Sequence, residues 1–154
     1  MISMKARYAV QALVYMASHV DQEETFVARK IAQAEDIPQK FLEEVLLDLR
    51  KDGLLASKAG KSGGYRFKVR AESITLQHVF QAISDPLALN PTATATNTSL
   101  RRLFVADDID SLLQPIESAL YKARHAVLSD VTIASLAATR LARSQEALVH
   151  DFQI

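Results

Sequence analysis

Positively charged side chains are concentrated in one short stretch of this 154-residue chain. Between positions 50 and 70 there are seven lysines and arginines and a single acid, Asp52. The seven cations are Arg50, Lys51, Lys58, Lys61, Arg66, Lys68 and Arg70. Glycines at positions 60, 63 and 64 allow a tight turn in the middle of the stretch. Scattered charges are usually only solvated, but cations gathered around a turn indicate a surface that binds phosphate groups, although the whole chain has no net charge.

A second group of polar side chains could contact the edges of nucleic-acid bases. Gln39, Lys40 and Glu43 fall together in the first turns of a predicted helix. In the major groove Gln pairs with adenine, Lys reaches guanine or a phosphate, and Glu accepts from the N4 amino group of cytosine. The alternative is that these are ordinary exposed residues, which any amphipathic helix has. The elements around them decide between the two interpretations.

These residues lie in a predicted helix–turn–helix that is followed by a β-hairpin. Apolar spacing predicts a short helix over residues 28–35 and a second one from Pro38 to about Asp52, where Gly53 ends it. The expected buried face of the second helix consists of Phe41, Leu42, Val45, Leu46 and Leu49. Residues 54–58 and 65–69 are β-prone and predict two strands. A helix–turn–helix alone is weak evidence, but one followed directly by a basic hairpin predicts a winged-helix domain that binds DNA.

The predicted DNA-contacting residues follow from this arrangement. The start of the second helix would enter the major groove, and the cations of the hairpin would lie against phosphates and the minor groove. The expected contacts are Lys5, Arg7, Gln39, Lys40, Glu43, Arg50, Lys58, Lys61 and Arg66.

The C-terminal part of the chain predicts a long helix that needs a partner. Its apolar stripe, which continues through Pro115, consists of Ile109, Leu112, Leu113, Ile116, Leu120, Ala123 and Val127. About 20 helical residues at ~1.5 Å each make a rod of roughly 30 Å. A small domain cannot cover that length, so the same helix of a second copy is the simplest cover, and a homodimer is expected.

The expected fold is mainly α with a small β-hairpin wing. It divides into a winged-helix DNA-binding domain over residues 1–84, a flexible loop over residues 85–99, and a region over residues 100–154. That last region holds the dimerisation helix and a C-terminal helix packing back on the wing domain. Helices over residues 4–20 and 74–84 complete the first domain, and residues 133–147 form the last helix. The loop is expected because residues 85–99 are rich in proline, asparagine and threonine.

Composition argues against several other classes of function. The chain has no cysteine, which removes disulfides, thiolate metal sites and cysteine nucleophiles together. Its four histidines lack metal-binding spacing, and no nucleophile–base pair suggests an enzyme. Position 55 is Leu55, so Gly60-Lys61-Ser62 does not belong to a phosphate-binding loop. No apolar run approaches the ~18 residues of a membrane span, and residues 1–7 lack the apolar core of a secretory signal, so a cytoplasmic location is expected.

Several short motifs together resemble one known family. They are Tyr8-Ala9 and Ala12-Leu13, Ile37-Pro38, Phe41-Leu42-Glu43, Gly53-Leu54-Leu55 and, most specifically, Gly63-Gly64-Tyr65. The chain resembles the Rrf2 family of bacterial winged-helix transcription regulators, typified by IscR, NsrR and CymR. The resemblance implies a homodimer whose long C-terminal helices cross, a palindromic operator and, most often, repression.

The chain departs from this family where many members bind a cofactor. Those members hold an iron–sulfur cluster through three cysteines that precede the long helix. Counted back from Val127-Leu128, the corresponding positions are Ser99, Val105, Ser111 and Gln114. None is a convincing iron ligand, so no cofactor is expected. Two alternatives stay open for the signal: a small-molecule effector, or docking of a metabolic enzyme.

Overall fold

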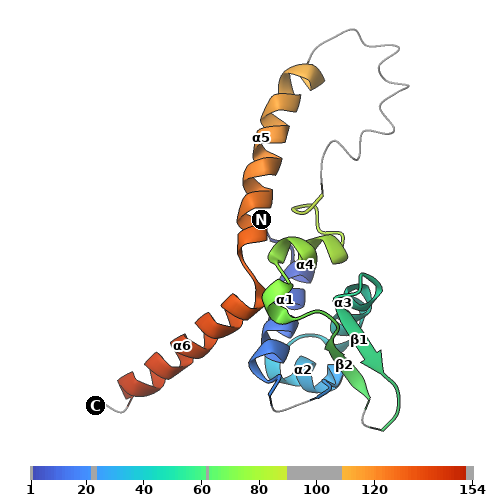
Figure 1. The fold of residues 1–154 in the computed structure, drawn as a ribbon, viewed down its shortest axis with the longest axis vertical. Helices are drawn as coiled ribbons and strands as arrows, with labels where there is room; N and C mark the ends of the chain where they lie inside the picture. The colour runs from blue at the N-terminus through green and yellow to red at the C-terminus, as the bar shows by residue number, and fades with distance from the viewer. Residues whose placement is uncertain (1, 22–23, 62, 90–108, 152–154) are drawn as a thin grey trace.

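The computed structural model describes residues 2–21, 24–61, 63–89 and 109–151. Its elements are α1 (Met4–Ser18), α2 (Ala28–Glu35), α3 (Gln39–Lys51), β1 (Leu55–Lys58), β2 (Gly64–Phe67), the 3₁₀ turn η1 (Ala71–Ser73), α4 (Leu76–Ala82), α5 (Ile109–Asp130) and α6 (Ile133–Asp151). The protein is mainly helical with a two-stranded antiparallel wing, as predicted. In Figure 1, α1–α4 and the wing form a body from which α5 and α6 extend in different directions.

Helix α1 lies at the centre of the body. The hydroxyl oxygen of Ser3 caps its first turn by accepting a hydrogen bond of 3.1 Å from the backbone N–H of Ala6. Its fully buried face consists of Ala6, Ala9, Ala12, Leu13 and Met16. The same helix contacts α2, α3, α4 and α6. Because three of the buried residues are alanines, these neighbours can approach its backbone closely.

The core face of α3 is confirmed except at Phe41. Leu42, Val45, Leu46 and Leu49 are fully buried, whereas the predicted burial of Phe41 was wrong, because its side chain is 47% exposed. An α-helix turns about 100° per residue, so Phe41 lies roughly 90° from the centre of the buried stripe. Its ring packs sideways against Tyr8 of α1 instead, with 6.0 Å between ring centroids and an interplanar angle of 70°.

A short turn fixes α3 relative to α2. Asp36 ends α2 in the left-handed conformation, with φ 52°. The N–H of the next residue, Ile37, donates a 3.0 Å hydrogen bond to the carbonyl of Ala32, and the side chain of Ile37 is buried. The helix–turn–helix is therefore held by its own backbone and anchored in the core.

The wing is a hairpin attached to the body by a third segment. In the register of β1 and β2, Leu55 pairs with Phe67 and Lys58 pairs with Gly64. The backbones of Tyr65 and Phe26 exchange hydrogen bonds of 2.7 and 2.8 Å, which tie the wing to the segment before α2. A Cβ atom on Gly64 would lie 2.6 Å from the carbonyl oxygen of Phe26. A side chain is therefore excluded at this position because backbone, not a flexible side chain, occupies the space.

Gly64→Ala is expected to destabilise the wing. The added methyl group would push β2 away from Phe26 and weaken both backbone hydrogen bonds, at a cost of about 1–3 kcal/mol in the free energy of unfolding. Urea denaturation of the variant and the parent measures this cost. Ala59→Ser, at an exposed position of the same hairpin, is the control and should unfold like the parent. Equal stability of the Gly64 variant and the parent would contradict the close approach.

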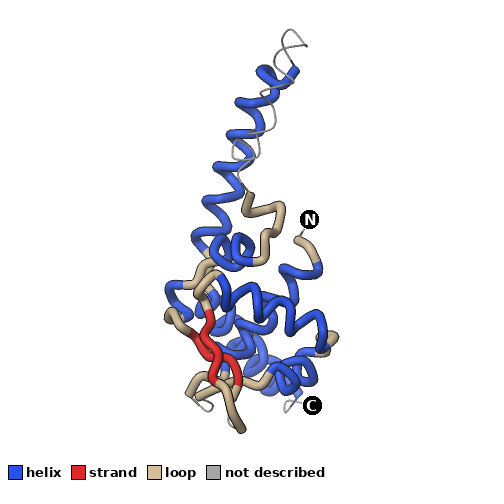
Figure 2. The backbone as a smooth tube through the Cα atoms, turned by 90° about the vertical axis from the view of Figure 1, so that its right-hand side faces the viewer, coloured by secondary structure: helices blue, strands red, loops and turns tan. Residues whose placement is uncertain are grey.

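The C-terminal helices are joined to the body by backbone hydrogen bonds. The N–H of Leu76 donates to the carbonyl of Val131 at 2.9 Å, and the N–H of Ile133 donates to the carbonyl of Ile74 at 2.8 Å. The junction between α5 and α6 is thus held against the start of α4. Figure 2 shows α5 extending from there well beyond the body. Within the described ranges, no helix combines the length and apolar character needed to cross a membrane.

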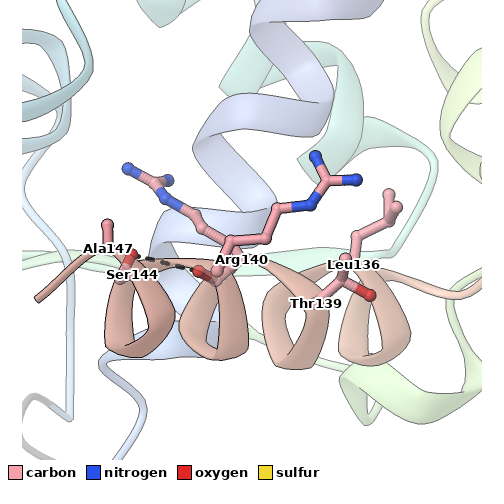
Figure 3. Close-up of a pocket in the computed structure, with 6 residues that line it drawn as sticks. Leu136, Thr139, Arg140, Ser144 and Ala147 are labelled. Carbon is pink, nitrogen blue, oxygen red and sulfur yellow. Dashed lines mark hydrogen bonds between the residues drawn. The ribbon is translucent and has the colours of Figure 1, made fainter. Parts of the chain in front are cut away.

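The first half of α6 packs against the body and is tied to α2. Ile133 and Ala137 are buried in the common core. Further along, Arg140 Nη1 lies 2.7 Å from Glu35 Oε1 at the end of α2, an ion pair rather than an aligned hydrogen bond. The Glu35 side chain is only 6% exposed and that of Arg140 is 47% exposed. Figure 3 shows Arg140 among the residues that line an open hollow along α6, with Leu136, Thr139, Ser144 and Ala147.

Arg140→Met is expected to destabilise the protein because it leaves the Glu35 carboxylate buried without its cation. The expected cost is about 1–3 kcal/mol, less than the ~3–5 kcal/mol of a fully buried pair because Arg140 is half-exposed. Thermal or urea unfolding measures it. Adding Glu35→Gln should recover most of the loss, and Arg143→Met, on the exposed part of the same helix, should have little effect. Equal losses for Arg140→Met and Arg143→Met would rule out a specific role for the pair.

Candidate nucleic-acid interface

The exposed face of α3 has the composition expected of a recognition helix. Gln39, Lys40, Glu43 and Glu44 are all exposed. The Gln39 side-chain amide donates a 2.8 Å hydrogen bond to Glu43 Oε1. This bond holds the two side chains together in the first turns of α3. The three predicted base-contacting residues therefore share one surface.

The wing carries its cations beside that surface. Helix α3 packs against β1, and in Figure 1 the two lie next to each other. Arg50, near the end of α3, donates a 3.1 Å hydrogen bond from Nη1 to the hydroxyl of Ser57 on β1. Lys58, Lys61 and Arg66 are exposed on or between the two strands. The helix and the wing thus form one continuous polar surface, which a bound duplex could contact with both groove and phosphates.

Partial pairing leaves most of this positive charge available. Lys58 lies 3.9 Å from Glu24, which is itself almost fully exposed, so the pair is weak. Arg70 lies 3.4 Å from Glu72. The pKa of Glu72 is lowered mainly by a hydrogen bond from its own backbone N–H and, to a smaller extent, by the charge of Arg70. The carboxylate therefore stays charged beside the arginine.

The two predicted contacts on α1 have different surroundings. Arg7 is exposed. The Lys5 ammonium lies 2.7 Å from Asp48 Oδ2 on α3 and also donates a 3.3 Å hydrogen bond to the carbonyl of Ile83. Lys5 therefore joins α1, α3 and the end of α4 in this structure. Its predicted contact with DNA would require the ammonium to share or exchange these partners.

A segment after α4 connects the long helix to this surface. The side chain of Asp85, which is buried, accepts hydrogen bonds from the Ser3 hydroxyl and from the N–H of Leu87. The next carbonyls accept from two other helices: Ala88 from Gln77 of α4 at 3.3 Å, and Leu89 from Arg124 of α5 at 3.0 Å. Residues 83–89 therefore contact α1, α4 and α5 at once. The rest of the predicted loop, residues 90–99, lies outside the described residues.

The predicted dimerisation stripe is exposed along α5. Its large apolar members are between 42% and 66% exposed: Ile109, Leu112, Leu113, Ile116, Leu120 and Val127. Ala123, on the same stripe, is exposed as well. Pro115 lies inside the helix, which continues unbroken through it. An apolar face of this length is typical of a surface that another chain covers.

Sequence reasoning missed two exposed residues of α3. Glu44 follows directly after Glu43 on the polar face, and Phe41 lies beside Lys40 with nearly half of its side chain exposed. The signal that could have found Phe41 is its angular position, because it lies at the edge of the apolar stripe and not within it. The prediction assigned every apolar residue of this face to the core, and Phe41 was therefore expected to be buried.

The residues of this chain do not fit a cysteine-ligated metal cluster. The full sequence has no cysteine, so such a cluster cannot form. Among the residues that the structure describes, no three histidine, aspartate or glutamate side chains are grouped as metal ligands.

A winged helix–turn–helix body with a long additional helix defines a class of DNA-binding transcription regulators. Residues 2–139 match the model of the Rrf2 family, described as an iron-dependent transcriptional regulator. The chain belongs to the Rrf2 family and is a DNA-binding transcriptional regulator, not an enzyme.

Individual relatives support the same assignment. An rrf2-like HTH-type transcriptional regulator of Rhodobacter capsulatus is 36% identical over 93 residues, which are 59% of this chain and 62% of that protein. A Mycobacterium tuberculosis protein named as an HTH-type transcriptional regulator is 30% identical over 157 residues, 99% of this chain and 90% of that one. IscR of Vibrio parahaemolyticus is 37% identical over 84 residues, 54% of this chain and 49% of IscR. The chain therefore spans less than two thirds of the first and third of these relatives.

Solved structures confirm the fold. CymR, the global cysteine regulator of B. subtilis, has a TM-score of 0.68 at 22% identity, with 90% of this chain and 97% of CymR covered. IscR of T. potens also has a TM-score of 0.68, at 23% identity, with 96% and 90% covered. The predicted winged helix with its long C-terminal helix is confirmed by these likenesses.

Proposed function

We propose that this protein acts in the cytoplasm as a homodimeric, sequence-specific repressor of transcription that binds a palindromic operator. The observation that carries the proposal is the continuous surface formed by the exposed face of α3 and the basic wing. Gln39, Lys40 and Glu43 would contact base edges in the major groove. Lys58, Lys61 and Arg66, together with Arg50 and Arg7, would contact phosphates of the adjoining backbone.

The exposed stripe of α5 supports the dimer. Helix α5 has 22 residues, which corresponds to about 33 Å of rod. Pairing this helix with its copy would bury the apolar stripe and place two recognition helices in a fixed relation. A dimer with twofold symmetry reads two half-sites about one helical turn apart, ~34–36 Å, and its operator is therefore a palindrome.

Lys61→Ala and Gln39→Ala are expected to weaken DNA binding in different ways. Loss of the Lys61 charge removes one phosphate contact, so affinity should fall on all sequences and the slope of log K against log salt should decrease by about one. Loss of Gln39 should mainly relax base preference, by about 1–3 kcal/mol at one position of each half-site. Titration of a labelled operator at several salt concentrations measures both effects.

The control for this pair is Arg143→Ala, which removes a cation from α6 without touching the proposed interface. It should leave the salt slope unchanged. If both Lys61→Ala and Gln39→Ala bound the operator like the parent, α3 and the wing would not be the DNA-binding surface.

Leu120→Glu is expected to convert the dimer to a monomer. The substitution puts a charge in the middle of the apolar stripe, where pairing of two copies would bury it. Light scattering after size-exclusion chromatography should show half the parent's mass, and operator affinity should fall by at least tenfold because each half-site is then bound alone. Lys122→Glu, about 200° around the same helix, is the matched control and should remain dimeric. A monomeric parent, or a dimeric Leu120→Glu variant, would refute this interface.

Selection of sheared genomic DNA by the purified protein tests the function as a whole. Enrichment of one palindromic motif would support the dimeric regulator, and the neighbouring genes would indicate its pathway. Failure to enrich any sequence at low salt would favour the alternative, in which a small-molecule effector is required or the protein acts mainly by docking a metabolic enzyme. Ligand-induced shifts in melting temperature and co-purification of one enzyme separate these two cases.

A further inference from the structure

Phe41 is a partly exposed aromatic residue at the start of α3. It is the third residue of α3, and its side chain is 47% exposed, whereas Leu42, Val45, Leu46 and Leu49 of the same helix are fully buried. The exposed part of the ring is apolar surface that a contact could cover. In a helix–turn–helix, the N-terminal turns of the second helix are the part that contacts base edges.

The ring of Phe41 is held in place from one side. Tyr8 of α1, itself packed against the core, contacts it edge-on with 6.0 Å between ring centroids. Edge-to-face contacts of this kind stabilise an aromatic pair beyond simple burial. The neighbouring Lys40 and Glu44 are exposed on the outer face of the helix. The free part of the ring therefore lies next to Lys40, one of the residues that would contact bases, while Tyr8 covers its other side.

We propose that Phe41 recognises the 5-methyl group of a thymine in the operator. This inference rests on the proposed function. Thymine presents the methyl group in the major groove, and apolar side chains such as Phe recognise it by contact. A phenyl ring offers no hydrogen bond, so among the exposed groups of a base pair in the groove the methyl group is the one that matches it. Tyr8 is a positioning residue that keeps the ring oriented toward the groove.

Replacement of single thymines by deoxyuridine tests this contact, because it removes only the methyl group. The probe is the operator obtained by genomic selection, with each thymine replaced in turn. When the critical thymine of one half-site is replaced, the affinity of the parent should fall about fourfold, the value expected for one buried methyl group. When the equivalent thymines of both half-sites are replaced, the affinity should fall about 16-fold. Phe41→Ala should bind the unmodified operator more weakly and show no difference between thymine and deoxyuridine at that position.

Two further measurements make the result specific. A cytosine in place of the critical thymine should weaken binding by the parent, and 5-methylcytosine should restore about fourfold of that loss because it returns the methyl group. Phe41→Leu, which keeps an apolar contact, should retain part of the discrimination. Circular dichroism and light scattering must show that each variant is folded and has the parent's mass.

The outcomes separate this inference from the proposed function. If the parent binds its operator but no deoxyuridine substitution changes affinity, or if Phe41→Ala keeps the full thymine preference, the methyl contact is refuted while the regulator stands. If Phe41→Ala changes the mass of the assembly, the ring is a protein–protein contact and the inference is wrong. If the parent selects no DNA sequence, the proposed function fails and this inference fails with it.

Discussion

Close packing on α1 is the constraint on which the rest of the structure depends. Ala6, Ala9 and Ala12 present a fully buried surface of small side chains, and α2, α3, α4 and α6 all contact this helix. A larger residue at any of the three positions would separate helices that are in contact and would leave voids or strain around it. Helix α3, the proposed recognition helix, and the first half of α6 are therefore oriented by the same element. Displacement of α1 would move the proposed DNA-binding surface relative to the base of the long helix.

Local patterns were sufficient to predict the elements and the wing. Apolar periodicity located the helices, with boundaries that differ by a few residues, because each helix buries a stripe of one period. The hairpin was predictable because two β-prone segments flank glycines that can take a positive φ, and Gly60 does so, with φ 104°. Gly63 and Gly64 have another role, because a Cβ there would lie 2.4 Å from Lys58 O and 2.6 Å from Phe26 O respectively. The error at Phe41 has the same origin as these successes. Apolar periodicity locates the centre of a buried stripe well. Whether a residue at the edge of the stripe is buried depends on the neighbouring helix, and here α1 covers only one side of Phe41, through Tyr8.

Contacts between distant charges could not be predicted. Lys5 and Asp48 are 43 residues apart in sequence, and Glu35 and Arg140 lie on helices from opposite ends of the chain. A charged residue gives no periodic signal, and its partner depends on how the helices pack, so Lys5 could be recognised from its type as a cation but not as a link between α1 and α3. The hydrogen bonds of residues 83–89 were concealed for the same reason. Their composition predicts a loop, whereas backbone carbonyls, which every sequence has, make the contacts to Gln77 and Arg124.

Residues 83–89 lie where a signal could act on the proposed DNA-binding surface. A ligand changes a protein's conformation only by the difference in its affinity for two states, so its site must lie where those states differ. Without cysteines, this chain cannot use a cysteine-ligated cluster for that purpose. Residues 83–89 join Arg124 of α5 to Ser3, the cap of α1, and to Lys5 within that helix. Lys5 in turn pairs with Asp48 of α3. A displacement of residues 83–89 would have to break or move hydrogen bonds both to α5 and to α1, so it would disturb the contacts of the long helix and of the helix that orients α3, without requiring a metal.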